Sequence, residues 1–459
     1  MASSTQLLGD VEFIFAECMR YRQLHQQWLE TRDCPDELRQ AFLYELQHPT
    51  DPRGKITCGR EAMRRLEGLA AVAARRAGID RQVDILTIRK ALARALLIRF
   101  VINRLPIDAK HLDRALAEAG RHAAASRATV THFVPCHLML AQEPATFRIG
   151  PVLFLRRQEF RTRLAVMIRA RGPEKWKDRK FLARASDYYR GFSWVAEVTV
   201  PNCDTETSKA VAERTVTAAL DCLHLLVRAR NSARMSVGGP ALHKDWRAAF
   251  TIKEARLLYS LSYGGPGEVA FEDDWITFFD DPDNAGFLHL CGVALEAAVD
   301  PALDRPISNR FLDAASWFGE GVRERAPGAK VIKFVTALER MLMTDEGDDI
   351  AKRVSQRAAA FCARPENPRT YFDVREKAQR AYALRSKLAH GSLSPGAPEA
   401  LEGVRLGSEL GEDAILCALA AFGETGLRSE RVNRRHLSDW FNQIAYGAEA
   451  HFNKAPSTA

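Results

Sequence analysis

Apolar residues recur at three- and four-residue spacing along most of this chain, and that periodicity constrains the fold more than any other feature. It dominates residues 1–128 and 301–459, so both regions are expected to be helical. Between them, in residues 129–300, short apolar runs are interrupted by Pro and Gly, and the run 192–200 alternates as a half-buried strand does. The sequence therefore predicts a mainly α-helical protein with a mixed α+β middle domain and a C-terminal helical bundle.

The same rules place individual elements within three expected domains, 1–128, 129–300 and 301–459. Asp108 is expected to cap a helix that opens at Ala109. The middle domain is expected to hold strands at 131–140, 145–149, 151–155 and 192–200, a helix at 206–230, and a hairpin of strands 255–263 and 268–271 around a glycine-rich turn, 264–267. The C-terminal helices are expected at 309–324, 329–343, 347–362, 373–390 and 408–447, the last broken near Gly426.

Composition favours a soluble globular protein, because 46% of the residues are hydrophobic and 27% are charged. We expect no signal peptide, no membrane span and a cytoplasmic location, since no uninterrupted apolar run reaches about 18 residues. The nine cysteines include no C-x-x-C pair, so they are interpreted as reduced, buried and inert thiols. No metal or other cofactor is expected, and the absence of a Walker A motif argues against a P-loop ATPase.

The predicted helix 373–390 carries the most informative pattern, because a charged residue interrupts its apolar stripe. The stripe consists of Val374, Ala378, Ala381 and Leu388. Arg385 stands where an apolar residue would continue it. A guanidinium stays protonated and is costly to bury unpaired, so Arg385 is expected to meet a carboxylate or a phosphate.

His390 lies five residues after Arg385, about 140° around the same helix. Ser386 lies one turn before His390, so the three polar side chains line one broad flank. Gly391 follows at once and is expected to end the helix as a C′ residue. A histidine in the last turn, near a guanidinium, suits acid–base chemistry.

These residues resemble the R-x4-H motif of HEPN domains, in particular the Apea-like HEPN group of bacterial defence proteins. The motif lies in the segment YALRSKLAHG. Two upstream segments, FLDAASWFGEGV and KFVTALERML, resemble the aromatic-rich helix and the "ALE" helix of that group. The resemblance covers about residues 306–449, a third of the chain. Ser386 replaces the Asn, Asp or His that directly follows the arginine in many HEPN ribonucleases.

The resemblance implies a metal-independent endoribonuclease, a probable antiphage or toxin-type effector that acts as a homodimer. Arg385 would stabilise charge on the phosphate and His390 would act as general acid or base while a ribose 2′-OH attacks. The alternative is a non-catalytic HEPN protein that binds nucleotide or RNA, or serves as a dimerisation module. Residues 1–300 would sense a trigger or hold the nuclease in check. A third interpretation is an interaction protein whose N-terminal helices bind a protein partner.

Two further residues are expected to support the motif. Glu339 lies at the edge of the apolar stripe of the helix 329–343 and matches the acid of the "ALE" segment, so it is the expected partner of Arg385. Arg357 interrupts another apolar stripe and is a second candidate partner for Glu339. The alternative is that these charges are exposed and have no functional consequence.

A basic block between Arg156 and Arg190 is a candidate nucleic-acid surface. It contains twelve basic and four acidic residues, so its formal charge equals the +8 of the whole chain. Aromatic residues lie within it, as in surfaces that stack bases. The residues chosen as candidate RNA contacts are Arg169, Arg171, Lys175 and Lys177. The alternative is a solvated charged face.

Overall fold

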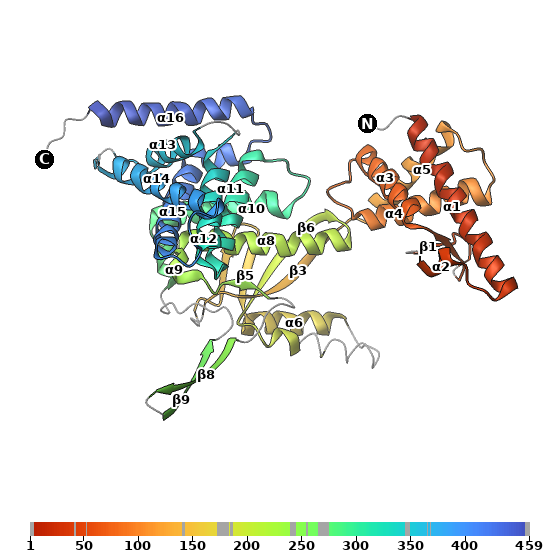
Figure 1. Cartoon of the computed structure of the whole chain (residues 1–459), viewed down its shortest axis with the longest axis horizontal. Coiled ribbons are helices and arrows are strands. Elements are labelled where there is room, and N and C mark those ends of the chain that lie inside the picture. The colour runs from red at the N-terminus through yellow and green to blue at the C-terminus, as the bar shows by residue number, and fades with distance from the viewer. Residues whose placement is uncertain are drawn as a thin grey trace. The chain divides into compact units, whose positions relative to one another are not determined.

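The computed structural model is mostly helical, with a small antiparallel sheet in the middle of the chain (Figure 1). It divides into two compact units, the first formed by Met1–Val130 with Val200–Ala210 and the second by Thr131–Thr199 with Val211–Ala459. The residues described are 4–40, 43–51, 53–139, 143–171, 183, 187–238, 245–253, 256–264, 275–344, 349–364, 366–367 and 369–454. The prediction of a mainly helical chain with a mixed middle region is therefore confirmed.

The first unit packs its helices around one apolar core. Its helices are α1 (Ser4–Thr31), α2 (Asp36–Gln40), α3 (Arg60–Ala77), α4 (Ile85–Leu96), the π-helical η1 (Leu97–Ile102) and α5 (Ala109–Ala124). Asp108 caps α5 as predicted, because its carboxylate accepts a hydrogen bond from the His111 amide at 2.8 Å.

The expectation that residues 1–128 are exclusively helical is wrong. Strands β1 (Tyr44–Gln47) and β2 (Lys55–Cys58) form an antiparallel pair in the first unit. Each strand has only four residues, too few for a two-residue alternation to stand out against helical spacing. The pairing of Gln47 with Lys55 closes this hairpin.

The second unit contains most of a five-stranded sheet in the order β4-β5-β6-β3-β7, and the first residues of β3 and the last residues of β6 are assigned to the first unit. The strands are β3 (Ala128–His137), β4 (Thr146–Ile149), β5 (Val152–Arg156), β6 (Trp194–Cys203) and β7 (Ser236–Val237). In β6 the predicted alternation holds, since Trp194, Ala196, Val198 and Val200 are all buried. Short apolar strands in this region were predicted correctly because Pro and Gly separate them.

A separate hairpin contains the predicted strand 255–263, and the pairing of that strand with 268–271 stays a prediction. Strand β9 (Arg256–Gly264) pairs with β8 (Asp245–Lys253), which precedes it, from Asp245↔Gly264 to Lys253↔Arg256. The predicted partner, 268–271, lies outside the described residues. The glycine-rich segment predicts a turn after β9. The observed partner, β8, precedes β9 in the chain.

Among the described residues, helices accompany the sheet at α6 (Arg157–Arg171), α8 (Thr205–Leu226) and α9 (Ala229–Ser232). Helix α6 packs on β5. Helix α8 lies across the strands, between the sheet and the C-terminal helices (Figure 1). Ala219 to Leu226 of α8 are all buried, which requires apolar layers on both sides of the helix.

The C-terminal part of the second unit is a helical bundle. It comprises the 3-10 turn η2 (Trp275–Phe279), α10 (Pro282–Val299), α11 (Pro306–Arg323), α12 (Pro327–Leu342), α13 (Ile350–Cys362), α14 (Arg369–Ala389), α15 (Pro398–Arg428) and α16 (Arg434–Lys454). The predicted break of helix 408–447 near Gly426 is present, although the first part begins ten residues earlier, at Pro398, and ends at Arg428. Gly423, with φ 61°, kinks α15, and α16 is a separate helix. In the described ranges, no helix combines the length and apolar character needed to cross a membrane.

Candidate functional site

Helix α14 buries one stripe of side chains against the bundle. The stripe consists of Tyr371, Ala378, Ala381, Leu384 and Leu388. Arg385 lies beside it, with 28% of its side chain exposed. The charged residue therefore stands at the edge of the buried face, where its guanidinium can reach a partner or a ligand.

The predicted pair of Glu339 and Arg385 is present. Arg385 Nη2 lies 3.5 Å from Glu339 Oε2, and the guanidinium carbon lies 5.5 Å from the centre of the Tyr382 ring. Burial, together with the Glu339 carboxylate to which the hydroxyl is hydrogen-bonded, raises the pKa of Tyr382. Arg385 Nε is buried and has no hydrogen-bond partner among the described residues. The guanidinium thus keeps an unused donor.

Arg385, Glu339 and Tyr382 line a cavity of about 680 Å³, which we call the arginine cavity. Three further arginines line it, Arg310 of α11, Arg340 of α12 and Arg434 of α16. These were not predicted, because their helices lie far apart in the sequence and no local spacing marks them. Trp317, 40% exposed, also lines the cavity and supplies a large aromatic surface.

Two of these arginines bond to carbonyl oxygens at the C-terminal end of α12. Arg310 Nη1 donates to the carbonyls of Arg340 at 2.8 Å and Met343 at 2.6 Å, and Arg434 Nε donates to that of Thr344. Burial, together with the charges of Arg340 and Arg434, lowers the pKa of Arg310 to about 10. Positive charge here is offset by carbonyl dipoles more than by carboxylates, which favours binding of an anion.

Arg340 differs from these two, because it has a carboxylate partner. Its Nη2 lies 2.5 Å from Asp313 Oδ2, and both side chains are about half exposed. Of the four arginines, Arg340 and Arg385 are therefore paired with acids. Among the described residues, no acid forms an ion pair with Arg310 or Arg434.

His390 lies one residue beyond α14, not within its last turn as predicted. Gly391 has φ 73°, and the Gly391 and Ser392 amides donate to the carbonyls of Leu388 and Lys387, so the helix ends in a Schellman motif. The His390 side chain is exposed, and it does not line the arginine cavity. Along the helix axis it lies about 7.5 Å from Arg385.

Ser386 is half-buried on the same helix, and its carbonyl accepts the His390 amide at 3.0 Å. No hydrogen bond of its hydroxyl is found among the described residues. One copy of the chain therefore does not bring Arg385, Ser386 and His390 together around a single cavity.

Arg357 is not a partner of Glu339, which corrects the second of the two predicted pairings. Its side chain is fully buried and donates to the Leu342 carbonyl at 2.6 Å and to Asn442 Oδ1 at 2.7 Å. The guanidinium also lies 5.0 Å from the Phe441 ring centre. Arg357 thus donates a hydrogen bond to a carbonyl at the C-terminal end of α12 and links this end to α16.

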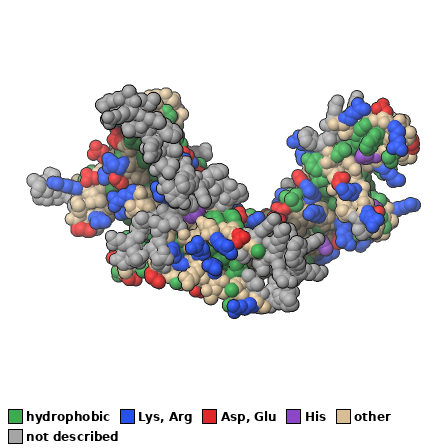
Figure 2. Space-filling model, turned by 90° about the horizontal axis from the view of Figure 1, so that it is seen from below, with side chains coloured by type: hydrophobic (Ala, Val, Ile, Leu, Met, Phe, Trp, Pro, Cys, Tyr) green, Lys and Arg blue, Asp and Glu red, His purple; other side chains and the backbone are tan. Residues whose placement is uncertain are grey.

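The basic block begins on α6, and Figure 2 shows Lys and Arg side chains gathered on the face that carries this helix. Arg157, Arg161 and Arg169 are exposed. Arg171 ends α6, but its side chain, like Lys175 and Lys177, lies outside the described residues. Of the neighbouring aromatic residues, Phe192 is buried and Tyr188 is 50% exposed.

Comparisons with models of protein families, with curated proteins and with solved structures found no match to this chain. Within the described residues, no group of three or more His, Cys, Asp or Glu side chains could hold a metal ion.

Proposed function

We propose that this protein binds RNA in the arginine cavity and cleaves it without a metal, as a ribonuclease of the HEPN type. The observation that carries the proposal is the buried, unused Nε donor of Arg385 in a cavity that three other arginines line. A phosphodiester offers the anionic oxygens that such donors bind, and arginine binds phosphate through two parallel hydrogen bonds. Glu339 would orient the guanidinium towards it.

The proposed reaction is an internal transesterification. The ribose 2′-OH attacks the adjacent phosphorus, a base removes its proton, and the 5′-oxygen leaves with a proton from an acid. The products are a 2′,3′-cyclic phosphate and a 5′-hydroxyl. Arg385 would stabilise the negative charge that develops on the phosphate, and His390 would transfer a proton.

Because His390 does not line the cavity of its own chain, this reaction requires a second copy. The two α14 helices would face each other, so that each His390 approaches the Arg385 region of the other chain. The HEPN resemblance implies such a composite site. A homodimer is therefore part of the proposal.

A second candidate function is RNA or nucleotide binding without cleavage. The position of His390 outside the cavity favours it, and so does Trp317, which can stack on a base beside the arginines. In this case His390 would have no chemical role. The two candidates share the binding site and differ only in turnover.

Incubation of the purified protein with single-stranded RNA in EDTA separates the two. Under the ribonuclease proposal, wild type produces fragments with 2′,3′-cyclic phosphate ends, whereas His390→Ala and Arg385→Lys produce none. His451→Ala, an exposed histidine on α16, is the matched control and should cleave normally. Binding without fragments at any protein concentration would support the second candidate. Neither binding nor cleavage would contradict both.

A further inference from the structure

The nine cysteines do not all share the buried environment that the sequence predicts, because Cys34, Cys362 and Cys417 are only half-buried. Six of the nine form three hydrogen-bonded thiol pairs: Cys18–Cys58, Cys222–Cys291 and Cys362–Cys417. All are free thiols. The first two pairs are buried, whereas Cys362 and Cys417 are only half-buried. The three pairs share one chemistry and differ in access.

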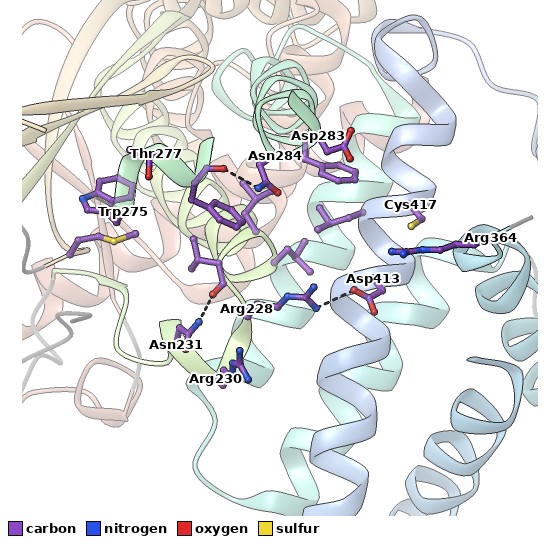
Figure 3. Close-up of a pocket in the computed structure, with 17 residues that line it drawn as sticks. Arg228, Arg230, Asn231, Trp275, Thr277, Asp283, Asn284, Arg364, Asp413 and Cys417 are labelled. Carbon is purple, nitrogen blue, oxygen red and sulfur yellow. Dashed lines mark hydrogen bonds and ion pairs between the residues drawn. The ribbon is translucent and has the colours of Figure 1, made fainter. Parts of the chain in front are cut away.

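Cys417 lines a second cavity of about 790 Å³, distinct from the arginine cavity, which we call the thiol cavity (Figure 3). In this view the Arg364 side chain lies between those of Cys417 and Asp413. Arg228, at the same cavity, binds Asp413 at 3.1 Å and the buried Glu412 at 3.0 Å. The acid nearest the thiol is thereby paired, while Arg364 has no such partner in the described part of the chain.

This environment favours the thiolate form of Cys417. The hydrogen bond from Cys362 lowers the pKa of Cys417, and the charge of Arg364 lowers it further, against the opposing effects of burial and Asp413. Reactive cysteines lie in electropositive, partly exposed surroundings, and redox-active ones have a second thiol within reach. Cys417 meets each of these conditions.

We infer that Cys417 is a hydroperoxide-reactive thiol and that Cys362 resolves its oxidised form into a disulfide. The Cys417 thiolate attacks the distal oxygen of a hydroperoxide, ROOH. The O–O bond breaks, Cys417 becomes a sulfenic acid, and the alkoxide takes up the proton that the thiol lost, giving ROH. Cys362 sulfur then attacks Cys417 sulfur, the S–O bond breaks, and hydroxide leaves with the Cys362 proton as water.

The backbone around Cys362 permits this closure. Two thiols in contact must approach to about 2.05 Å to form a disulfide, which requires a small local shift. Cys362 is the last residue of α13, and Ala363 after it is extended, with φ −63° and ψ 136°. Cys222 and Cys291, in contrast, lie inside α8 and α10, where both backbones are fixed by helical hydrogen bonds. The Cys222–Cys291 pair therefore serves as a control for backbone freedom, and both buried pairs serve as controls for solvent access.

The test treats the folded full-length chain with hydrogen peroxide, blocks the remaining thiols, and maps disulfide-linked peptides by mass spectrometry. The Cys362–Cys417 peptide should form about tenfold faster than either buried pair, because access of the peroxide to the thiol controls thiol oxidation. In Cys362→Ser, Cys417 should instead accumulate as sulfenic acid, detectable with dimedone. In Cys417→Ser, the native fold should remain and no disulfide should form at Cys362.

Arg364→Gln supplies a milder variant that leaves both thiols in place. It should slow alkylation of Cys417 by iodoacetamide while circular dichroism stays unchanged. Equal oxidation rates for all three pairs, or a Cys362→Ser protein whose Cys417 resists both peroxide and dimedone, would overturn the inference. Its outcome is independent of the RNA assays, because neither cysteine lines the arginine cavity.

Discussion

Arg357 and Arg385 occupy equivalent places in sequence, since each interrupts an apolar stripe on neighbouring helices, yet their surroundings differ. Arg357 is fully buried, and a carbonyl and an amide oxygen accept its donors. Arg385 is partly exposed at a cavity, has one ion pair at 3.5 Å, and keeps a buried Nε donor unused. A buried arginine with matched acceptors has a structural role, whereas an unmatched donor at a cavity is available to a ligand.

Replacement of Arg357 should have the largest effect on stability. Arg357→Ala leaves the Leu342 carbonyl and the Asn442 amide without their partner and creates a void, so it should destabilise by about 3–5 kcal/mol. Urea unfolding monitored by circular dichroism measures this. Lys352→Ala, an exposed residue on the same helix, should change stability by less than about 0.5 kcal/mol. If Arg357→Ala left the free energy of unfolding unchanged, Arg357 would have no structural role that distinguishes it from Arg385.

A third arginine, Arg323, is bound to a buried acid and extends the comparison to pH. Arg323 Nη1 donates to Asp221 at 2.7 Å and to His224 Nε2 at 3.1 Å. Burial raises the pKa of Asp221 from 3.8 to about 7, and burial together with the charge of Arg323 lowers the pKa of His224 from 6.5 to about 3. Folding thus raises the pKa of Asp221 and lowers the pKa of His224.

Whether each group stabilises the protein more or less as pH rises depends on which state, folded or unfolded, binds its proton. Between about pH 4 and 7 the folded state holds an Asp221 proton that the unfolded chain has lost, so this contribution to stability falls as pH rises. Between about pH 3 and 6.5 the unfolded chain holds a His224 proton that the folded state lacks, so that contribution rises with pH. The two oppose each other in wild type.

Asp221→Asn should therefore leave the pH dependence that His224 contributes to stability without the opposing contribution of Asp221. Its Tm should rise with pH between about 4 and 6.5 more steeply than that of wild type, by several degrees, since one pKa unit is about 1.4 kcal/mol. Differential scanning fluorimetry at several pH values in this interval measures both slopes. Parallel pH profiles for the two proteins would exclude Asp221 as a proton-binding group.

Replacement of Arg385 should affect stability less than that of Arg357, and binding more. Arg385→Ala should cost about 1–2 kcal/mol, because a partly exposed pair lies between the exposed and the buried cases. It should also abolish RNA binding in the arginine cavity, measured by fluorescence anisotropy. The control is Arg380→Ala, on the same helix as Arg385, which removes an exposed pair with Glu402 of α15 at 3.0 Å. It should bind RNA as wild type does.

These differences explain which features of the site could be predicted from the sequence. The pairing of Glu339 with Arg385 was predictable because both residues sit at the edges of periodic stripes. The end of α14 was predictable because Gly391 follows it. The arginine cavity was not, because Arg310, Arg340 and Arg434 converge only after three helices pack. The role of Arg357 was not predictable either, because its acceptors are backbone carbonyl and amide groups that no sequence pattern marks.

His390 should contribute little to stability. Its side chain is exposed beyond the end of α14, so His390→Ala should change the free energy of unfolding by less than about 1 kcal/mol. Under the proposed ribonuclease function the same variant loses all cleavage. A Tm several degrees below that of wild type, in a protein with no activity on any RNA, would make His390 a structural residue instead.

The α6 surface should show the smallest effect on stability. Arg161 and Arg169 are exposed, so charge reversal at both should leave the Tm unchanged. If this face contacts RNA, the variant should bind more weakly, and its salt dependence should fall by about one unit of slope per lost phosphate contact. Unchanged affinity across a salt titration would identify α6 as a solvated face and leave the arginine cavity as the sole proposed contact.

Helix α8 has a consequence for the order in which the second unit opens. From Ala219 to Leu226 each residue is buried, including the polar Asp221 and His224. A segment enclosed by layers on both sides cannot expose its amides until one layer detaches. Amide hydrogen exchange should therefore be slowest in this part of α8, and its rate should report when the sheet and the bundle separate. The last protected amides of the unit would then mark the structure that unfolds last.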